Sequence, residues 1–230
     1  MNYRIVDHSP IKLSNLSIPI EDLQLAIGNT NDRYVEIYKK TGYLGLNFFS
    51  ILDFRVLSGL IGESFSVELC SINSGFVKNP YIDGYPDLLQ NSTPIMKRYF
   101  SSCQNSDFIK YKYGGLEVKN TFGTKKANSF LLIGDQRINY INKKLDWKAH
   151  HRETNYLVAL LSDYVEGLPK IVALFYSDSL KREDWAAIPK PKTGSAMTSF
   201  SAINSSGFAK LKEGLKICLD KPEYLNYTRL

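Results

Sequence analysis

Residues 156–176 have the sequence YLVALLSDYVEGLPKIVALFY, and two apolar runs within this stretch decide the fold class. The runs YLVALLSDY (156–164) and KIVALFY (170–176) are separated by VEGLP, a connection that carries Gly and Pro. Short apolar runs flanked by such residues are typical of strands, and the connection predicts a hairpin. Since polar residues do not alternate along either run, we expect the hairpin in the middle of a sheet that is buried on both faces.

The segments on either side of this hairpin predict helices and one more strand. Residues 51–72 (ILDFRVLSGLIGESFSVELCSI) have an apolar residue every three or four positions, which predicts a helix packed on the core. Residues 73–85 are rich in turn formers, and GLEVK (115–119) predicts a short strand. Residues 188–195 are rich in Pro, Lys, Gly and Ser, and residues 205–219 predict a helix. We therefore expect one domain of α/β (mixed α+β) class, with a central mixed β-sheet flanked by helices.

Length and composition indicate a folded, intracellular protein. The 230 residues are 43% hydrophobic and 13% aromatic, which is enough for a packed core. No apolar run approaches the roughly 20 residues of a membrane span, and the first residues lack the apolar core of a signal peptide. The three cysteines are widely spaced and form no CxxC, as expected for buried thiols in a reducing compartment. The expected location is therefore the cytoplasm, with no membrane partner.

Charge is distributed unevenly along the chain. Residues 1–120 carry 12 Lys/Arg and 12 Asp/Glu, whereas residues 121–230 carry 17 and 11, so the net charge of +6 arises in the second half. A one-sided basic surface favours a polyanionic partner, because neutralised phosphates release condensed counterions. A basic surface that serves solubility is the alternative.

Three residues form the strongest candidate for a reactive site. Asp87 follows Pro86, and thirty residues later the predicted strand carries Glu117 and Lys119. Residues i and i+2 of a strand point to the same face, so these two side chains project together while Val118 packs behind them. Two carboxylates beside a lysine make an oxygen-rich pocket that suits Mg²⁺, which lowers the pKa of a bound water. A solvated strand edge is the alternative, since an ExK tripeptide is common by chance.

The segments YPDLL (85–89) and GGLEVKNT (114–121) resemble the PD-(D/E)XK motif of a nuclease superfamily. The wider pattern is similar to type II restriction endonucleases, and the resemblance spans residues 57–178, with a weaker similarity over residues 193–207. It implies a restriction-endonuclease-like core and Mg²⁺-dependent hydrolysis of phosphodiester bonds in double-stranded DNA at a short specific sequence, leaving 5′-phosphate ends. It also implies a homodimer, because a two-fold protein matches a two-fold DNA site.

The resemblance implies a role for each residue of the candidate site. Asp87 and Glu117 would hold Mg²⁺, together with the carbonyl oxygen of Val118, and Lys119 would assist the attacking water. The thirty-residue gap is longer than in the shortest members of the family and needs an insertion. Asp83 is therefore a rival for the role of Asp87.

A glutamate from a preceding helix commonly joins the site in this family. The segment GLIGESF offers Glu63 for that position, and Glu68 on the same predicted helix is its rival. Under this interpretation residues 1–50 are an N-terminal elaboration, residues 51–180 form the catalytic core, and residues 181–230 supply DNA-recognition and C-terminal elements.

The residues expected to contact DNA follow the strand that carries Glu117. Two lysines come directly after that strand, a WKAHHR segment (147–152) holds two of the three histidines, and PKPKTGSAMTSFSAIN (189–204) offers cations, hydroxyls and amides for phosphates and base edges. A polar turn, a strand entrance and a surface loop are the respective structural alternatives. The expected DNA-binding residues are Lys125, Lys126, His150, His151, Arg152, Lys190, Lys192, Thr193, Ser195, Ser199 and Asn204.

Motifs that the sequence lacks narrow the function further. It has no GxxxxGKS loop, which disfavours a nucleotide cofactor, and no zinc-finger spacing, HExxH or GxSxG motif. The sequence thus favours a type II restriction endonuclease with DNA as partner and Mg²⁺ as cofactor. Two alternatives stay open: a structure- or damage-specific repair nuclease of the same superfamily, and a non-catalytic DNA-binding protein.

Overall fold

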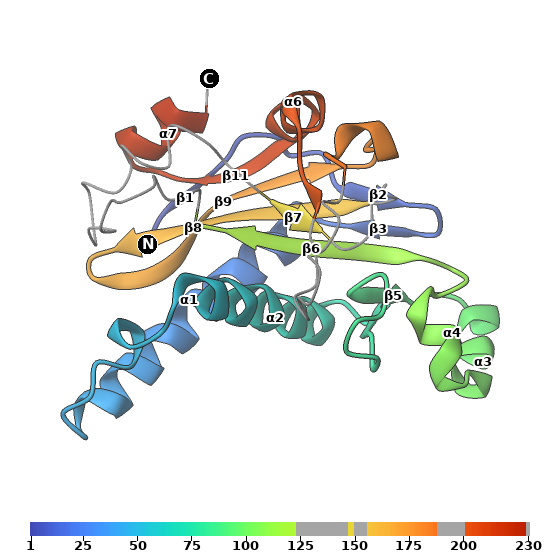
Figure 1. Cartoon of the computed structure of the whole chain (residues 1–230), viewed down its shortest axis with the longest axis horizontal. Coiled ribbons are helices and arrows are strands. Elements are labelled where there is room, and N and C mark those ends of the chain that lie inside the picture. Colours follow the sequence, from blue (N-terminus) through green and yellow to red (C-terminus); the bar gives the residue numbers. More distant parts are fainter. Residues whose placement is uncertain (123–146, 150–155, 188–200, 229–230) are drawn as a thin grey trace, which may run out of the picture.

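A mixed β-sheet forms the centre of the molecule (Figure 1). The computed structural model describes residues 1–122, 147–149, 156–187 and 201–228. Within these ranges seven strands pair in the order β1-β11-β9-β8-β6-β5-β4, with β6 and β8 parallel and the other neighbours antiparallel. The α/β class with a central mixed sheet is confirmed. The strands are β1 (Tyr3–Ile5), β4 (Phe76–Lys78), β5 (Leu88–Gln90), β6 (Gly115–Thr121), β8 (Leu157–Val165), β9 (Leu168–Ser177) and β11 (Leu215–Leu219).

Helices cover both faces of this sheet. Figure 1 shows α1 (Ile20–Gly42) and α2 (Phe54–Ile72) on one face, and α6 (Ser205–Glu213) and α7 (Pro222–Thr228) on the other. Two apolar cores result: Val118, Val158 and Leu160 pack toward α1 and α2, whereas the opposite core lies toward α6 and α7. Every residue of β8 is buried, so the prediction of a hairpin inside a doubly covered sheet is confirmed.

The turn of the central hairpin is tighter than the sequence predicted. Strands β8 and β9 extend to Val165 and Leu168, leaving Glu166 and Gly167 as the connection, with φ values of 55° and 78°. Positive φ at both central residues matches the right-handed twist of the two strands. Pro169 therefore lies within β9, in the part of that strand that does not pair with β11.

The predicted helix 51–72 is confirmed as α2, with its start shifted to Phe54. Asp53 determines this start, because its side chain accepts hydrogen bonds from the backbone N–H groups of Arg55 (2.6 Å) and Val56 (3.4 Å). These bonds satisfy donors that have no partner inside the first turn of a helix.

The prediction of one helix over residues 205–219 is wrong. Helix α6 ends at Glu213, and residues 215–219 form the fully buried strand β11 beside β9. Gly214 separates the two elements at a close approach, since a Cβ there would lie 1.7 Å from the carbonyl oxygen of Tyr176. Pairing with β9 thus overrides the helical tendency of this segment.

Several elements, including the long helix α1, have no clear signal in the sequence. The turn-rich segment 73–85 contains β4, and the first 50 residues contain β1, α1, a β2–β3 hairpin (Ile11–Leu13 and Leu16–Ile18) and the 3₁₀ turn η1 (Phe48–Ser50). A second, two-stranded sheet pairs β7 (Lys148–Ala149) with β10 (Ser201–Ala202), and a further 3₁₀ turn, η3 (Arg182–Asp184), lies between these strands in the chain. Among the described helices, none is both long enough and apolar enough to span a bilayer.

The segment between Asp87 and Glu117 connects β5 to β6. It folds into α3 (Pro94–Ser102) and α4 (Asn105–Ile109), which lie beyond the β5 end of the sheet in Figure 1. The chain therefore leaves β5, forms a small helical unit, and returns to pair β6 with β5.

Candidate active site

Asp87, Glu117 and Lys119 come together where the β5–β6 ladder ends. The ladder pairs Leu88 with Leu116, which brings Asp87 opposite Glu117. The Lys119 ammonium lies 2.5 Å from Glu117 Oε1 and 3.3 Å from Asp87 Oδ2. The Lys119 ammonium therefore bridges two carboxylates, one on β6 and one on the residue just before β5.

The two strand residues project from the face of the sheet that α6 covers. In the β6–β8 ladder Glu117 pairs with Leu157 and Lys119 pairs with Ala159, and both of these partners belong to the core on the α6 side. Directly paired residues on neighbouring strands point to the same face. Val118 packs into the opposite core, so the arrangement predicted for GLEVK is the one observed.

Backbone hydrogen bonds hold the site as firmly as its ion pairs. The Val118 N–H donates to Asp87 Oδ2 at 2.9 Å, and the Asp87 N–H donates to Glu117 Oε2 at 3.2 Å. On the other side of β6, the Glu117 N–H donates to the carbonyl of Tyr156 at 2.9 Å. The backbone N–H and C=O of a strand residue point to the same side of the strand. Because the Val118 N–H points toward Asp87, the Val118 carbonyl faces Asp87 as well.

Burial and charge make Glu117 an unusual carboxyl group. Its residue is 3% exposed, and desolvation raises its pKa to about 7; Lys119 opposes this shift, while the nearby Asp87 carboxylate adds to it. Burial lowers the pKa of Lys119, but the two carboxylates outweigh this effect and hold it above its ordinary value. Lys119 is therefore a cation at neutral pH.

The donor set fits a hard divalent cation. Asp87 and Glu117 both direct carboxylate oxygens at the Lys119 ammonium. The negative charge of Asp87 is one of the causes that raise the pKa of Glu117. Mg²⁺ is commonly held by one or two protein carboxylates, with water and phosphate oxygens in its other positions. No group of three or more Asp, Glu, His or Cys side chains arranged for a metal occurs in the described part of the chain. Two carboxylates and the Val118 carbonyl are thus the ligands that this site offers.

Asp83, the rival of Asp87, and Glu63, the helix glutamate predicted for the site, both lie elsewhere. Asp87 makes the contacts to Glu117 and Lys119, whereas Asp83 is exposed four residues earlier. Glu63, also proposed for the site, forms an ion pair with Lys78 of β4 and starts from α2, which covers the opposite face of the sheet.

Glu68, the rival of Glu63, faces away from the site. It is buried against α1, where its carboxylate pairs with Arg33 and accepts a hydrogen bond from Asn29 at 3.2 Å. The structure therefore brings neither helix glutamate into contact with Asp87, Glu117 or Lys119.

Ten of the eleven predicted DNA-binding residues lie outside the described residues: Lys125, Lys126, His150, His151, Arg152, Lys190, Lys192, Thr193, Ser195 and Ser199. Ala149 and Ser201, the described residues next to two of these segments, are partners in the β7–β10 ladder.

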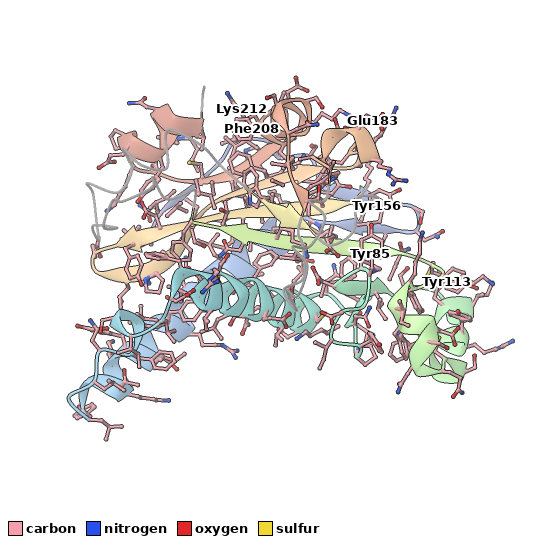
Figure 2. The ribbon with its side chains drawn as sticks, viewed as in Figure 1. Tyr85, Tyr113, Tyr156, Glu183, Phe208 and Lys212 are labelled. Atoms are coloured by element: carbon pink, nitrogen blue, oxygen red, sulfur yellow. The ribbon has the colours of Figure 1, made fainter. Side chains whose placement is uncertain are left out.

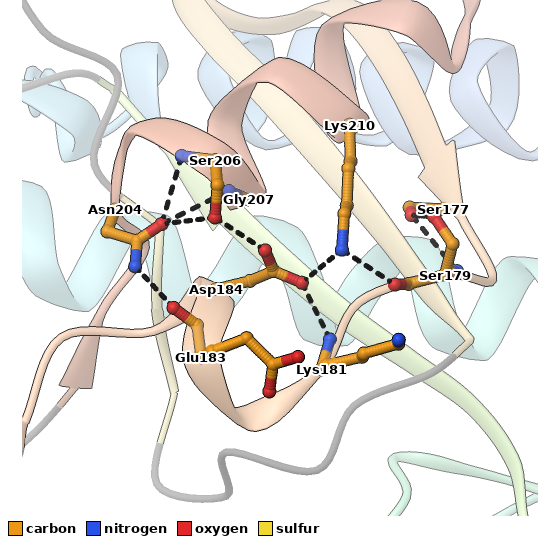
Figure 3. Close-up of polar contacts among 9 residues, drawn as sticks. All are labelled: Ser177, Ser179, Lys181, Glu183, Asp184, Asn204, Ser206, Gly207 and Lys210. Atoms are coloured by element: carbon orange, nitrogen blue, oxygen red, sulfur yellow. Dashed lines mark hydrogen bonds and ion pairs between the residues drawn. The ribbon is translucent and has the colours of Figure 1, made fainter.

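Asn204, the eleventh, caps helix α6 (Figure 3). Its Oδ1 accepts from the N–H groups of Ser206 (3.0 Å) and Gly207 (3.2 Å), and its Nδ2 donates to the carbonyl of Glu183 at 2.6 Å. These bonds give the Asn204 side chain a structural role at the start of α6.

Asp184 organises the same region, and no motif in the sequence indicates this role. Its side chain accepts hydrogen bonds from the Lys181 N–H (2.8 Å), the Ser206 hydroxyl (2.6 Å) and the Lys210 ammonium (2.6 Å), as Figure 3 shows. Desolvation opposes its ionisation, but these donors outweigh that effect and lower its pKa. The cluster joins η3 to α6 and serves the fold.

The chain matches no protein-family model, no curated protein and no solved structure. Asp87, Glu117 and Lys119 are therefore the features of the chain that indicate a function.

Proposed function

We propose that this protein is a Mg²⁺-dependent endonuclease of the type II restriction class, with a PD-(D/E)XK core. It hydrolyses phosphodiester bonds of double-stranded DNA at a short specific sequence and leaves 5′-phosphate ends. The observation that carries the proposal is the bridge that Lys119 makes between the Asp87 and Glu117 carboxylates.

The order of the elements also supports the proposal. The resemblance in the sequence implies a helix, then the Pro-Asp dipeptide, then ExK on the next strand. In the structure α2 is followed by β4, by β5 with Asp87 just before it, and by β6 with Glu117 and Lys119. A parallel β8 follows β6 in the sheet.

The charge states favour a division of labour among the three residues. Asp87 and Glu117 would hold Mg²⁺, which would lower the pKa of a coordinated water. Lys119 is held protonated by its neighbours, so it donates hydrogen bonds to the attacking water and stabilises negative charge on the phosphate. The carbonyl of Val118 faces the same side and is available to the cation.

Digestion of phage DNA and supercoiled plasmid tests the proposal. We expect discrete fragments with Mg²⁺, none with EDTA, and a loss of cleavage of about 10²–10³-fold in Lys119→Ala. Asp87→Asn should likewise abolish cleavage, whereas its matched control Asp83→Asn should keep it. A smear, or nicking that depends on DNA structure, would favour a repair nuclease. Salt-sensitive binding without cleavage would leave a DNA-binding protein.

A further inference from the structure

The insertion between β5 and β6 forms a distinct unit, which we call the insert lobe and define as residues 91–114. It contains α3 and α4, and its aromatic residues pack in a small core of their own around Phe108 and Tyr111, beneath Leu89 of β5. Figure 1 shows it at the β5 end of the sheet, and Figure 2 shows Tyr113 of the lobe on the same side as Tyr85.

This lobe is the basic part of an otherwise acidic half of the chain. It carries four Lys/Arg and one Asp, a net charge of +3, so the remainder of residues 1–120 carries a net charge of −3. The four cationic residues are all exposed: Lys97, Arg98, Lys110 and Lys112. Residues 1–120 therefore have no net charge as a whole, although the insert lobe within them is positively charged.

Three of these cations are held without an acidic partner. Within the part of the chain that the structure describes, no ion pair involves Lys97, Arg98 or Lys112. The Lys112 ammonium lies 5.4 Å from the ring centroids of both Tyr99 and Tyr113. Aromatic faces orient a cation while leaving its N–H groups available to an anion.

The lobe is fixed to the loop that carries Asp87. The Tyr85 N–H donates to the carbonyl of Ile109 at 3.1 Å, and the Tyr111 N–H donates to the carbonyl of Tyr85 at 2.9 Å. Buried Asn79 adds a clamp, since its Nδ2 donates to the carbonyls of Pro86 and Phe108, both at 3.0 Å. The lobe therefore has a set position relative to the candidate site.

We propose that the insert lobe binds the phosphate backbone of duplex DNA beside the scissile phosphate. This inference rests on the proposed function and adds a positioning surface to it: Lys97, Arg98 and Lys112 contact phosphates and fix the register of the duplex, without touching the reacting atoms. Phosphate contacts of this kind position a protein on DNA and carry no sequence information.

Binding of a fluorescent DNA duplex, measured without divalent cations, tests the lobe independently of cleavage. The variant Lys97→Ala/Arg98→Ala removes two exposed cations from the lobe. Its matched control, Lys39→Ala/Lys40→Ala, removes two exposed cations from the last turn of α1, at the other end of the molecule (Figure 1). Both variants have the same net charge, so any general electrostatic effect is shared.

We expect the plot of log association constant against log salt to become shallower by about 2 in the lobe variant, because each lost phosphate contact removes about 0.9 from the slope. The control should keep the wild-type slope, and Lys112→Ala should reduce it by about 1. Equal slopes in the lobe variant and the control, or no DNA binding by the wild type, would overturn the inference.

The same measurements separate this inference from the proposed function. Cleavage that depends on Lys119, together with an unchanged salt slope in the lobe variant, would refute DNA binding by the insert lobe and support the nuclease proposal. A salt slope that depends on the lobe, in a protein that cuts no DNA, would support DNA binding by the lobe and refute the nuclease proposal. Circular dichroism of each variant confirms that these exposed substitutions leave the fold intact.

Discussion

The backbone N–H of Asp87 donates a hydrogen bond to the side chain of Glu117, with 3.2 Å between Asp87 N and Glu117 Oε2. One residue further along β6, the N–H of Val118 donates in return to Asp87 Oδ2 at 2.9 Å. The two carboxylates thus continue the β5–β6 pairing beyond Leu88 and Leu116, where the backbone ladder stops. The residues proposed to hold the cation are therefore also part of the sheet.

Glu117→Gln should change how stability depends on pH. The raised pKa of Glu117, about 7, means that the folded state holds this proton more tightly than the unfolded chain does. Its contribution is then fully present below its ordinary pKa and is lost as the pH rises through about 7. The wild type should lose stability relative to the variant between the ordinary pKa of 4.5 and about pH 7, by at most about 1.4 kcal/mol per pH unit.

Urea denaturation at several pH values, without divalent cations, measures this difference. The Glu117–Lys119 ion pair is present only where Glu117 is ionised, and it is one of the causes that set the folded-state pKa, so its loss belongs to the same pH-dependent difference. Parallel curves for wild type and variant would show that Glu117 is ionised throughout.

Mg²⁺ binding should strengthen as the pH rises toward neutrality. A cation needs the ionised form of Glu117, so binding displaces a proton wherever the pH lies below the raised pKa. Isothermal titration should show an affinity that increases by at most about tenfold per pH unit and levels off above about pH 7. Asp83→Asn should retain this profile and Asp87→Asn should lose binding; an affinity independent of pH would contradict the assignment of Glu117 as a ligand.

Gly115→Ala should disrupt the site through the backbone. A Cβ at Gly115 would lie 1.9 Å from the carbonyl oxygen of Leu88, so β5 and β6 could no longer approach each other beside Asp87. Gly59→Ala, in α2, meets no atom within 4 Å and should stabilise the helix by about 0.5–1 kcal/mol. Thermal unfolding of both variants checks the contrast, and an unchanged melting temperature in Gly115→Ala would contradict the close approach.

The sequence was sufficient for those parts of the site that lie within one element. Glu117 and Lys119 share a face because a strand repeats every two residues, and this local rule holds without knowledge of the sheet. Asp87 reaches them through the β5–β6 register, which three-residue strands do not reveal by their pattern. The resemblance to a known motif supplied that link where periodicity did not.

The fold was predictable to the same extent. The apolar runs of β8 and β9 and the amphipathic pattern of α2 are long enough to be recognised. Strand β11 was mistaken for the end of a helix, because its identity comes from pairing with β9 and from the contact of Gly214 with Tyr176. Such contacts between distant segments override local preference.

Asp184→Ala should destabilise the fold strongly although the residue lies outside the candidate site. Its carboxylate is 1% exposed and accepts bonds from Lys181, Ser206 and Lys210. Removing it takes the acceptor from the Lys181 N–H and one of two acceptors from Ser206 and Lys210, at a cost of about 3 kcal/mol, or roughly 6–12 °C in melting temperature for a chain of this length. The neighbouring Glu183→Ala, at an exposed side chain, should change stability by less than about 0.5 kcal/mol.

Because the lowered pKa of Asp184 makes its contribution present above its ordinary pKa, the wild type should lose this advantage over Asp184→Ala as the pH falls through the folded-state pKa. Equal melting temperatures for the two variants would show that η3 and α6 are joined by other contacts.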